Sequence, residues 1–183
     1  MQTITLVTGN KHKLTEWQRM IPAAIELKSV DVDLDEIQSL DVEAVITDKA
    51  KRAYAIVGEP IIVEDVSAGL DELHGLPGSF IKFFNEKLGN DALFQMTKMT
   101  TSPTATAVCV TAYYDGTRLL IGHGEVRGSV VAQRSDNGFG FDSCFVPAGE
   151  TKTYAEMLPS KKDTLSHRAK AIKQLVIKIQ ELA

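Results

Sequence analysis

The 183-residue sequence has few of the features that mark specialised protein classes. It contains two cysteines, Cys109 and Cys144, in no paired metal-ligand spacing, which argues against a disulfide scaffold and favours two reduced thiols. No apolar run reaches the length of a membrane-spanning helix, and the N-terminus lacks a basic segment followed by a long apolar one. We therefore expect a cytoplasmic protein that has no membrane partner.

The charge balance argues against a nucleic-acid partner. Lys and Arg number 20 against 24 Asp and Glu, a net charge of −4 at pH 7, whereas duplex-binding proteins usually carry a basic surplus. Hydrophobic residues make up 44% and charged residues 24%, which is typical of a soluble globular chain. The length fits a single domain over 1–183.

Apolar periodicity predicts strands and helices that alternate at first, then a hairpin around Asp115-Gly116, then a closing helix. The predicted strands are 4–7, 29–34, 61–63, 105–114 and 117–126, and the predicted helices are 11–20, 41–57, 80–88 and one from about 164. This order favours a mixed α/β sheet.

The first strand is followed by a turn and a basic helix start, Thr8-Gly9-Asn10-Lys11-His12-Lys13. Asn10 is a suitable N-cap. Free N–H groups at a helix N-terminus, together with two lysines, can bind a phosphate group. The same pattern also fits a solvated basic helix start.

Acidic residues follow two predicted strands. Glu64 and Asp65 come directly after the apolar run 61–63, and Glu36 follows the alternating segment 29–34. Carboxylates at the carboxyl edge of a sheet suit Mg²⁺, which binds a few carboxylates together with phosphate oxygens and water. Surface acids at strand ends are the alternative. Asp31, Asp33 and Asp35 fit a solvated strand face.

Two further segments point to a ligand. Lys161, Lys162, His167 and Arg168 surround the predicted start of the C-terminal helix, where cations are unfavourable unless an anion joins them. The loop Phe139-Gly140-Phe141-Asp142 combines two aromatic rings with a carboxylate and suits a stacked base. A solvated basic patch and ordinary loop packing are the respective alternatives.

Taken together and in order, these segments resemble the inosine triphosphate pyrophosphatase family. The matching pieces are Thr8 to Lys13, Val63-Glu64-Asp65, Gly75-Leu76-Pro77-Gly78, Ile81-Lys82, Phe139 to Asp142, Thr153-Tyr154-Ala155-Glu156-Met157 and Ser166-His167-Arg168. They span nearly the whole chain. The resemblance implies Mg-dependent hydrolysis of nonstandard purine nucleoside triphosphates, such as ITP, dITP and XTP, to the monophosphate and pyrophosphate.

The resemblance also implies a long twisted mixed sheet flanked by helices, two lobes with a central cleft, and a homodimer. It assigns Glu36 and Asp65 to the metal, which is Mg²⁺ with Mn²⁺ as a substitute, and Asp65 to the activation of water. The residues it assigns to substrate binding are Thr8, Gly9, Asn10, Lys11, His12, Lys13, Lys49, Phe139, Gly140, Phe141, Asp142, Lys162, His167 and Arg168.

Three departures and two alternatives accompany the resemblance. Ser143 stands where the family usually has proline, His74 stands where glycine is common, and Val66-Ser67-Ala68 departs from the shorter bacterial version after the paired acids. A Maf-type pyrophosphatase for other modified nucleotides is one alternative, although the segment Ser166-His167-Arg168 argues against it. A catalytically silent nucleotide-binding module is the other, although Glu36 and Asp65 are both present.

Overall fold

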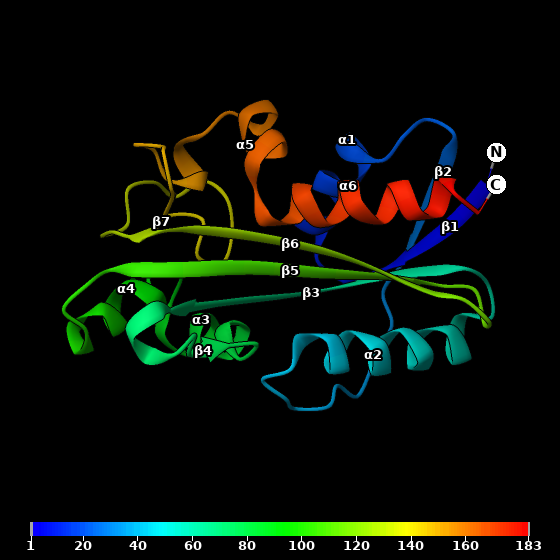
Figure 1. Ribbon diagram of the computed structural model, residues 1–183, viewed down its shortest axis with the longest axis horizontal. Helices are drawn as coiled ribbons and strands as arrows, with labels where there is room; N and C mark the ends of the chain where they lie inside the picture. Colours follow the sequence, from blue (N-terminus) through cyan, green and yellow to red (C-terminus); the bar gives the residue numbers. More distant parts are fainter. Residues whose placement is uncertain (1, 183) are drawn as a thin grey trace. The chain divides into compact units, whose positions relative to one another are not determined.

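The computed structural model describes residues 2–182 and confirms a mixed α/β fold with helices beside a seven-stranded sheet (Figure 1). The strand order is β2-β1-β3-β5-β6-β7, and β4 (Pro77–Gly78) pairs with β3. The chain divides into two compact units: residues 2–65, 109–124 and 168–182 form the first, and residues 66–108 and 125–167 form the second. That 1–183 act as one domain with a cleft between lobes stays a prediction.

In the first unit, β1 (Gln2–Val7) pairs in parallel with β2 (Ile25–Val30) and with the start of β3 (Ile61–Leu70). Helix α6 (His167–Gln180) covers one face of these strands, and α2 (Val42–Val57) lies on the other (Figure 1). The core beneath α6 contains Ile4, Leu6, Trp17, Ile62, Tyr113, Ile172 and Leu175, all almost fully buried.

Two helix starts are confirmed where a side chain caps the helix. Helix α1 (Lys11–Met20) begins after Asn10, whose Oδ1 accepts from the N–H groups of His12 and Lys13 at 2.9 and 3.2 Å. Asp41 caps α2 in the same way.

Two strand predictions were wrong in their bounds. The strand expected at 29–34 is β2 at Ile25–Val30, because pairing with β1 uses these residues and the acidic segment after Val30 forms no strand. The strand expected at 61–63 continues to Leu70. Glu64 and Asp65 therefore lie within β3 and not at its end.

The predicted hairpin is present as β5 (Thr104–Tyr114) and β6 (Leu119–Val130). Its connection has four residues and not two, because Asp115 Oδ1 accepts from the N–H groups of Thr117 and Arg118 at 3.0 and 2.8 Å.

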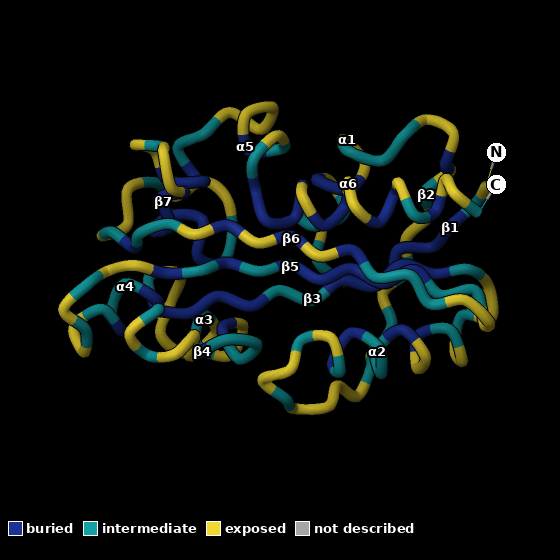
Figure 2. The backbone as a smooth tube through the Cα atoms, viewed as in Figure 1, coloured by how far each residue is buried: buried dark blue, intermediate teal, exposed yellow. Residues whose placement is uncertain are grey.

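In the second unit, α3 (Ile81–Leu88) and α4 (Ala92–Met96) lie on one side of the strands, and α5 (Pro159–Leu165) lies on the other (Figure 1). Strand β7 (Phe145–Pro147) pairs antiparallel with β6. Short 3₁₀ turns occur at Asp71–Leu73, Thr97–Met99 and Tyr154–Glu156. Leu70, Leu93, Ala105, Ala107, Phe145 and Tyr154 belong to its core. Figure 2 shows buried strands and helices whose outer faces are exposed.

The expected single helix from about 164 is two helices, α5 and α6, which are separated at Ser166. In residues 2–182 no helix is long and apolar enough to cross a bilayer.

Candidate active site

The predicted phosphate-binding turn lies between β1 and α1 in the first unit. Thr8 Oγ1 accepts from the Asn10 N–H at 3.1 Å, and Asn10 itself caps the helix. The N–H groups of Asn10, His12 and Lys13 therefore already donate to side chains. An ideal Cβ on Gly9 would lie 2.5 Å from Asp31 Oδ1, so Gly9 gives this carboxylate its close approach to the turn.

Glu64 and Arg168 form the centre of a buried ionic network in the same unit. Arg168 is 2% exposed and Glu64 is 4% exposed. Arg168 Nε and Nη2 each donate to Glu64 at 2.9 Å, while its Nη1 donates to Glu16. Trp17 Nε1 donates to Glu64 at 2.9 Å, and Lys13 Nζ lies 3.2 Å from Glu64 Oε1. Glu64 is thus surrounded by donors.

The network keeps both central groups charged. Burial opposes the ionisation of Glu64, but the charges of Arg168 and Lys13 outweigh it and lower the pKa of Glu64 below its usual range. Burial also disfavours the charged form of Arg168, yet Glu64 and Glu16 raise its pKa. Its guanidinium is therefore held between two carboxylates of the protein itself.

A second cluster, Glu36-Lys49-Asp65, joins the segment after β2 to α2 and β3. Lys49 Nζ is 2.6 Å from Glu36 Oε1 and 3.9 Å from Asp65 Oδ1, and it donates to the main-chain oxygen of Glu64 at 3.2 Å. Burial raises the pKa of Asp65, Lys49 and Lys13 act against this rise, and the charges of Glu36 and Glu64 add to it. Two carboxylates therefore converge on one cationic group.

This donor set fits a divalent metal. Hard oxygen ligands from one or two carboxylates, with remaining positions open to water and phosphate, are what Mg²⁺ requires. Lys49 Nζ stands beside both acids, so a cation of the protein marks the position where positive charge is favourable. Because Glu64 is engaged by Arg168, Glu36 and Asp65 are the carboxylates of this cluster that could hold such an ion.

The second unit contains a separate cluster around Lys162, which is 6% exposed. Its Nζ lies 2.7 Å from Asp142 Oδ2, 5.2 Å from the ring centroid of Phe139 and 5.5 Å from that of Tyr154. The same Asp142 oxygen accepts from the Phe139 N–H at 3.1 Å. Asp142 thus holds both the loop and the lysine in position.

Two glycines and a histidine complete this cluster. Gly138 and Gly140 have φ of 78° and 59°, and a Cβ on Gly138 would lie 2.7 Å from Asp142 Oδ2, so the loop requires glycine there. His167 is 2% exposed, with its ring 5.6 Å from that of Phe141 and 5.7 Å from that of Tyr154. The result is an aromatic wall with a buried ion pair.

The structure thus groups the predicted site residues into two sets. Thr8 to Lys13, Glu36, Lys49, Asp65 and Arg168 belong to the first unit, and Phe139 to Asp142, Lys162 and His167 belong to the second. Sequence reasoning gave no role to Glu16 or Tyr154. Glu16 stands one turn after Lys13 on a polar helix, a pattern that equally fits a solvated face, so no sequence signal identified it.

Comparisons with known proteins find relatives that match nearly the whole chain. A model described as the Ham1 family matches residues 4–178. The proteins named "Inosine triphosphate pyrophosphatase" from Yarrowia lipolytica and Schizosaccharomyces pombe are 39% and 38% identical to the chain. The first match covers 99% of this chain and 97% of the relative, and the second covers 96% and 94%.

Solved structures agree with the sequence relatives. A HAM1 protein from Coxiella burnetii is similar with a TM-score of 0.85 and 27% identity, over 99% of this chain and 100% of that one. A nucleoside-triphosphatase named dITP/XTP pyrophosphatase, from Mycobacterium abscessus, has a TM-score of 0.73 and 26% identity over 96% and 99%.

Proposed function

The chain belongs to the Ham1 family, and we propose from this membership that it is an enzyme that hydrolyses nonstandard purine nucleoside triphosphates. Its substrates are ITP, dITP and XTP, its products are the nucleoside monophosphate and pyrophosphate, and its role is to clear these nucleotides from the cellular pool. The observation that carries the chemistry is the convergence of Glu36 and Asp65 on one cationic position at Lys49 Nζ.

We assign the metal and the triphosphate to the first unit. Glu36 and Asp65 would hold Mg²⁺, or Mn²⁺ in its place, and the bound ion would supply positive charge to the phosphate oxygens. Lys13 and Lys49 add positive charge where the leaving pyrophosphate develops negative charge. Thr8 to His12 supply the turn and the helix start next to it.

Asp65 is the candidate general base. Hydrolysis adds the oxygen of water to phosphorus, breaks the bond between the α- and β-phosphates and requires a proton to leave the water. Burial raises the pKa of Asp65, which makes its carboxylate a better proton acceptor than a fully solvated aspartate. The carboxylate of Glu64 is less suitable, because donors occupy it and its pKa is lowered.

We assign the purine to the second unit. Phe139 offers an aromatic face, and its position depends on the Asp142 oxygen that accepts from its N–H. Lys162 supplies a donor beside this ring, and His167 lines the same aromatic wall. Arg168 is a positioning residue, because its guanidinium donates to Glu64 and Glu16 and holds these two side chains in place.

A panel of triphosphates tests the proposal. Purified protein is incubated with ITP, XTP, dITP, ATP, GTP and a modified pyrimidine triphosphate, with and without Mg²⁺, and both products are quantified. We expect monophosphate and pyrophosphate from ITP and XTP, little turnover of ATP, and none in chelator. Equal turnover of ATP and ITP would contradict the assignment, and preference for the modified pyrimidine would favour the Maf-type alternative.

We further propose that the protein is a homodimer and lies in the cytoplasm. Light scattering would test the first statement, and cell fractionation would test the second.

A further inference from the structure

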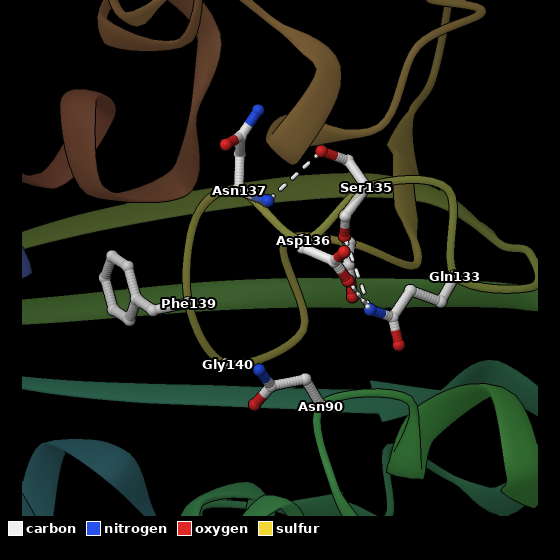
Figure 3. A pocket seen from close by; sticks show the side chains of 8 residues that line it. Asn90, Gln133, Ser135, Asp136, Asn137, Phe139 and Gly140 are labelled. Carbon is white, nitrogen blue, oxygen red and sulfur yellow. Dashed lines mark hydrogen bonds between the residues drawn. The ribbon is translucent and has the colours of Figure 1, made fainter.

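A small polar pocket lies behind the loop that carries Phe139, within the second unit (Figure 3). It has a volume of about 60 Å³, and its polar lining includes Asn90, Gln133, Asp136 and Asn137. The ring of Phe139 points to the opposite side of the loop from Gln133 and Asp136 (Figure 3). Phe139 and Gly140 also line the pocket, so it adjoins the aromatic face that we assign to the purine.

One buried hydroxyl in the lining has no partner. Ser143 is 4% exposed, and within residues 2–182 its Oγ makes no hydrogen bond. Leaving a buried hydroxyl without a partner costs about 1–3 kcal/mol. The main-chain oxygen of Ser143 accepts from the Arg134 N–H at 3.0 Å, so its backbone is tied to the loop that forms the other side of the pocket. A polar occupant of the pocket would remove this cost.

The charges of the lining select the type of occupant. Asp136 carries the only formal charge among the residues that line the pocket, and it is negative. Arg134, the nearest cation in sequence, directs Nη1 to the main-chain oxygen of Thr151 at 3.0 Å and does not line the pocket. Amide, hydroxyl and carboxylate oxygens without a neighbouring cation favour a hard cation over an anion.

A neutral amide donor, Gln133 Nε2, already occupies the place that a cation would take. Gln133 Nε2 lies 3.0 Å from Asp136 Oδ1 and 3.4 Å from the main-chain oxygen of Ser135, so two oxygens converge on one amide nitrogen (Figure 3). A cation in this place would need the amide to turn its oxygen inward, which adds a further ligand.

We propose that this pocket is a binding site for a monovalent cation, K⁺ or Na⁺, with Asp136 and Ser143 as ligands. A single carboxylate among neutral oxygens balances one positive charge, whereas divalent sites gain affinity from several carboxylates. The bound ion would connect the loop 133–137 to Ser143 and so fix the loop that carries Phe139. The site does not depend on the proposed hydrolysis, because its test measures stability.

The test compares melting temperatures in KCl, NaCl and tetramethylammonium chloride at equal ionic strength, using the nucleotide-free full chain. At ten times the Kd, we expect K⁺ or Na⁺ to raise the Tm by roughly 3–6 °C over tetramethylammonium. Asp136→Asn should abolish this difference, and the exposed control Glu86→Gln should keep it. Comparison of the KCl and NaCl series identifies the preferred ion.

The variant Ser143→Ala tests whether the Ser143 hydroxyl is a ligand of the ion or only a buried hydroxyl without a hydrogen-bond partner. If Ser143 is a ligand, the concentration for the half-maximal Tm shift should increase roughly 3–10-fold, as expected for the loss of one polar interaction. A Tm that is equal in all three salts would overturn the site. An unchanged ion response in Asp136→Asn would also overturn it, and an unchanged response in Ser143→Ala would remove Ser143 from it.

Discussion

Replacement of Glu64 by glutamine tests the buried ionic network of the first unit. Glutamine keeps the size of the side chain and an oxygen that can accept from Trp17 Nε1, but it removes the negative charge opposite Arg168 and Lys13. Arg168 would retain Glu16 as a partner. Removing one partner of a buried ion pair costs about 3–5 kcal/mol, because the other charge stays buried.

For a chain of this length, each kcal/mol corresponds to about 2–4 °C in Tm. We therefore expect Glu64→Gln to lower the Tm by roughly 6–20 °C and to lower the urea midpoint without changing the m-value. The control is Glu26→Gln, an exposed glutamate of the same unit that accepts from Thr3 Oγ1, and it should stay near the wild type. A loss below about 1 kcal/mol for Glu64→Gln would refute the reasoning, because surface pairs alone give that much.

The network also has a pH signature with a defined sign. The pKa of Glu64 is lower in the folded protein, so its stabilisation is present above the unfolded-state value of about 4.3 and is lost as the pH falls below it. Unfolding free energies measured from pH 7 to pH 3 should show this loss in the wild type. The loss of unfolding free energy between pH 7 and pH 3 should be smaller in Glu64→Gln than in the wild type. Parallel curves of unfolding free energy against pH for the two proteins would argue against a contribution of Glu64 ionisation to stability.

Two further outcomes concern the second unit and the thiols. Lys162→Met leaves the Asp142 carboxylate buried without its cation, so we expect the free energy of unfolding to fall by about 3–5 kcal/mol and the KM for ITP to rise. The exposed control Lys161→Met should change neither quantity strongly. Equal urea midpoints for the two variants would contradict this expectation. Burial raises the pKa of Cys144 to about 12 and that of Cys109 above its usual value. We therefore expect neither thiol to react with a disulfide reagent at pH 8 until the protein unfolds. Rapid labelling of the native protein would refute the burial of these thiols.

Local signals explain which elements could be predicted. Asn10 and Asp41 cap their helices through their own side chains, so sequence alone located both starts. The bounds of β2 and β3 depend on pairing with β1 and with β4, and that pairing is not visible in a single sequence. The apolar run 61–63 therefore predicts a strand that ends before Glu64 and Asp65, although both residues lie within β3.

The basic residues near 162–168 show a different limit. Their position next to a helix start predicts a bound anion, and carboxylates of the protein itself supply that charge: Asp142 for Lys162, and Glu64 with Glu16 for Arg168. These partners lie 20, 104 and 152 positions away in the sequence. The spacing of the motif could therefore indicate a need for negative charge but not its source.

The most direct test of the central claim is the kcat/KM for ITP of Asp65→Asn in saturating Mg²⁺. Asparagine is similar in size but cannot serve as an anionic metal ligand or accept the proton of water, so we expect a loss of about 10²–10⁴-fold with a Tm close to that of the wild type. The control Asp33→Asn removes an exposed carboxylate outside the cluster and should retain full activity. Wild-type turnover by Asp65→Asn would contradict the assignment of the reaction to the cluster of Glu36, Lys49 and Asp65.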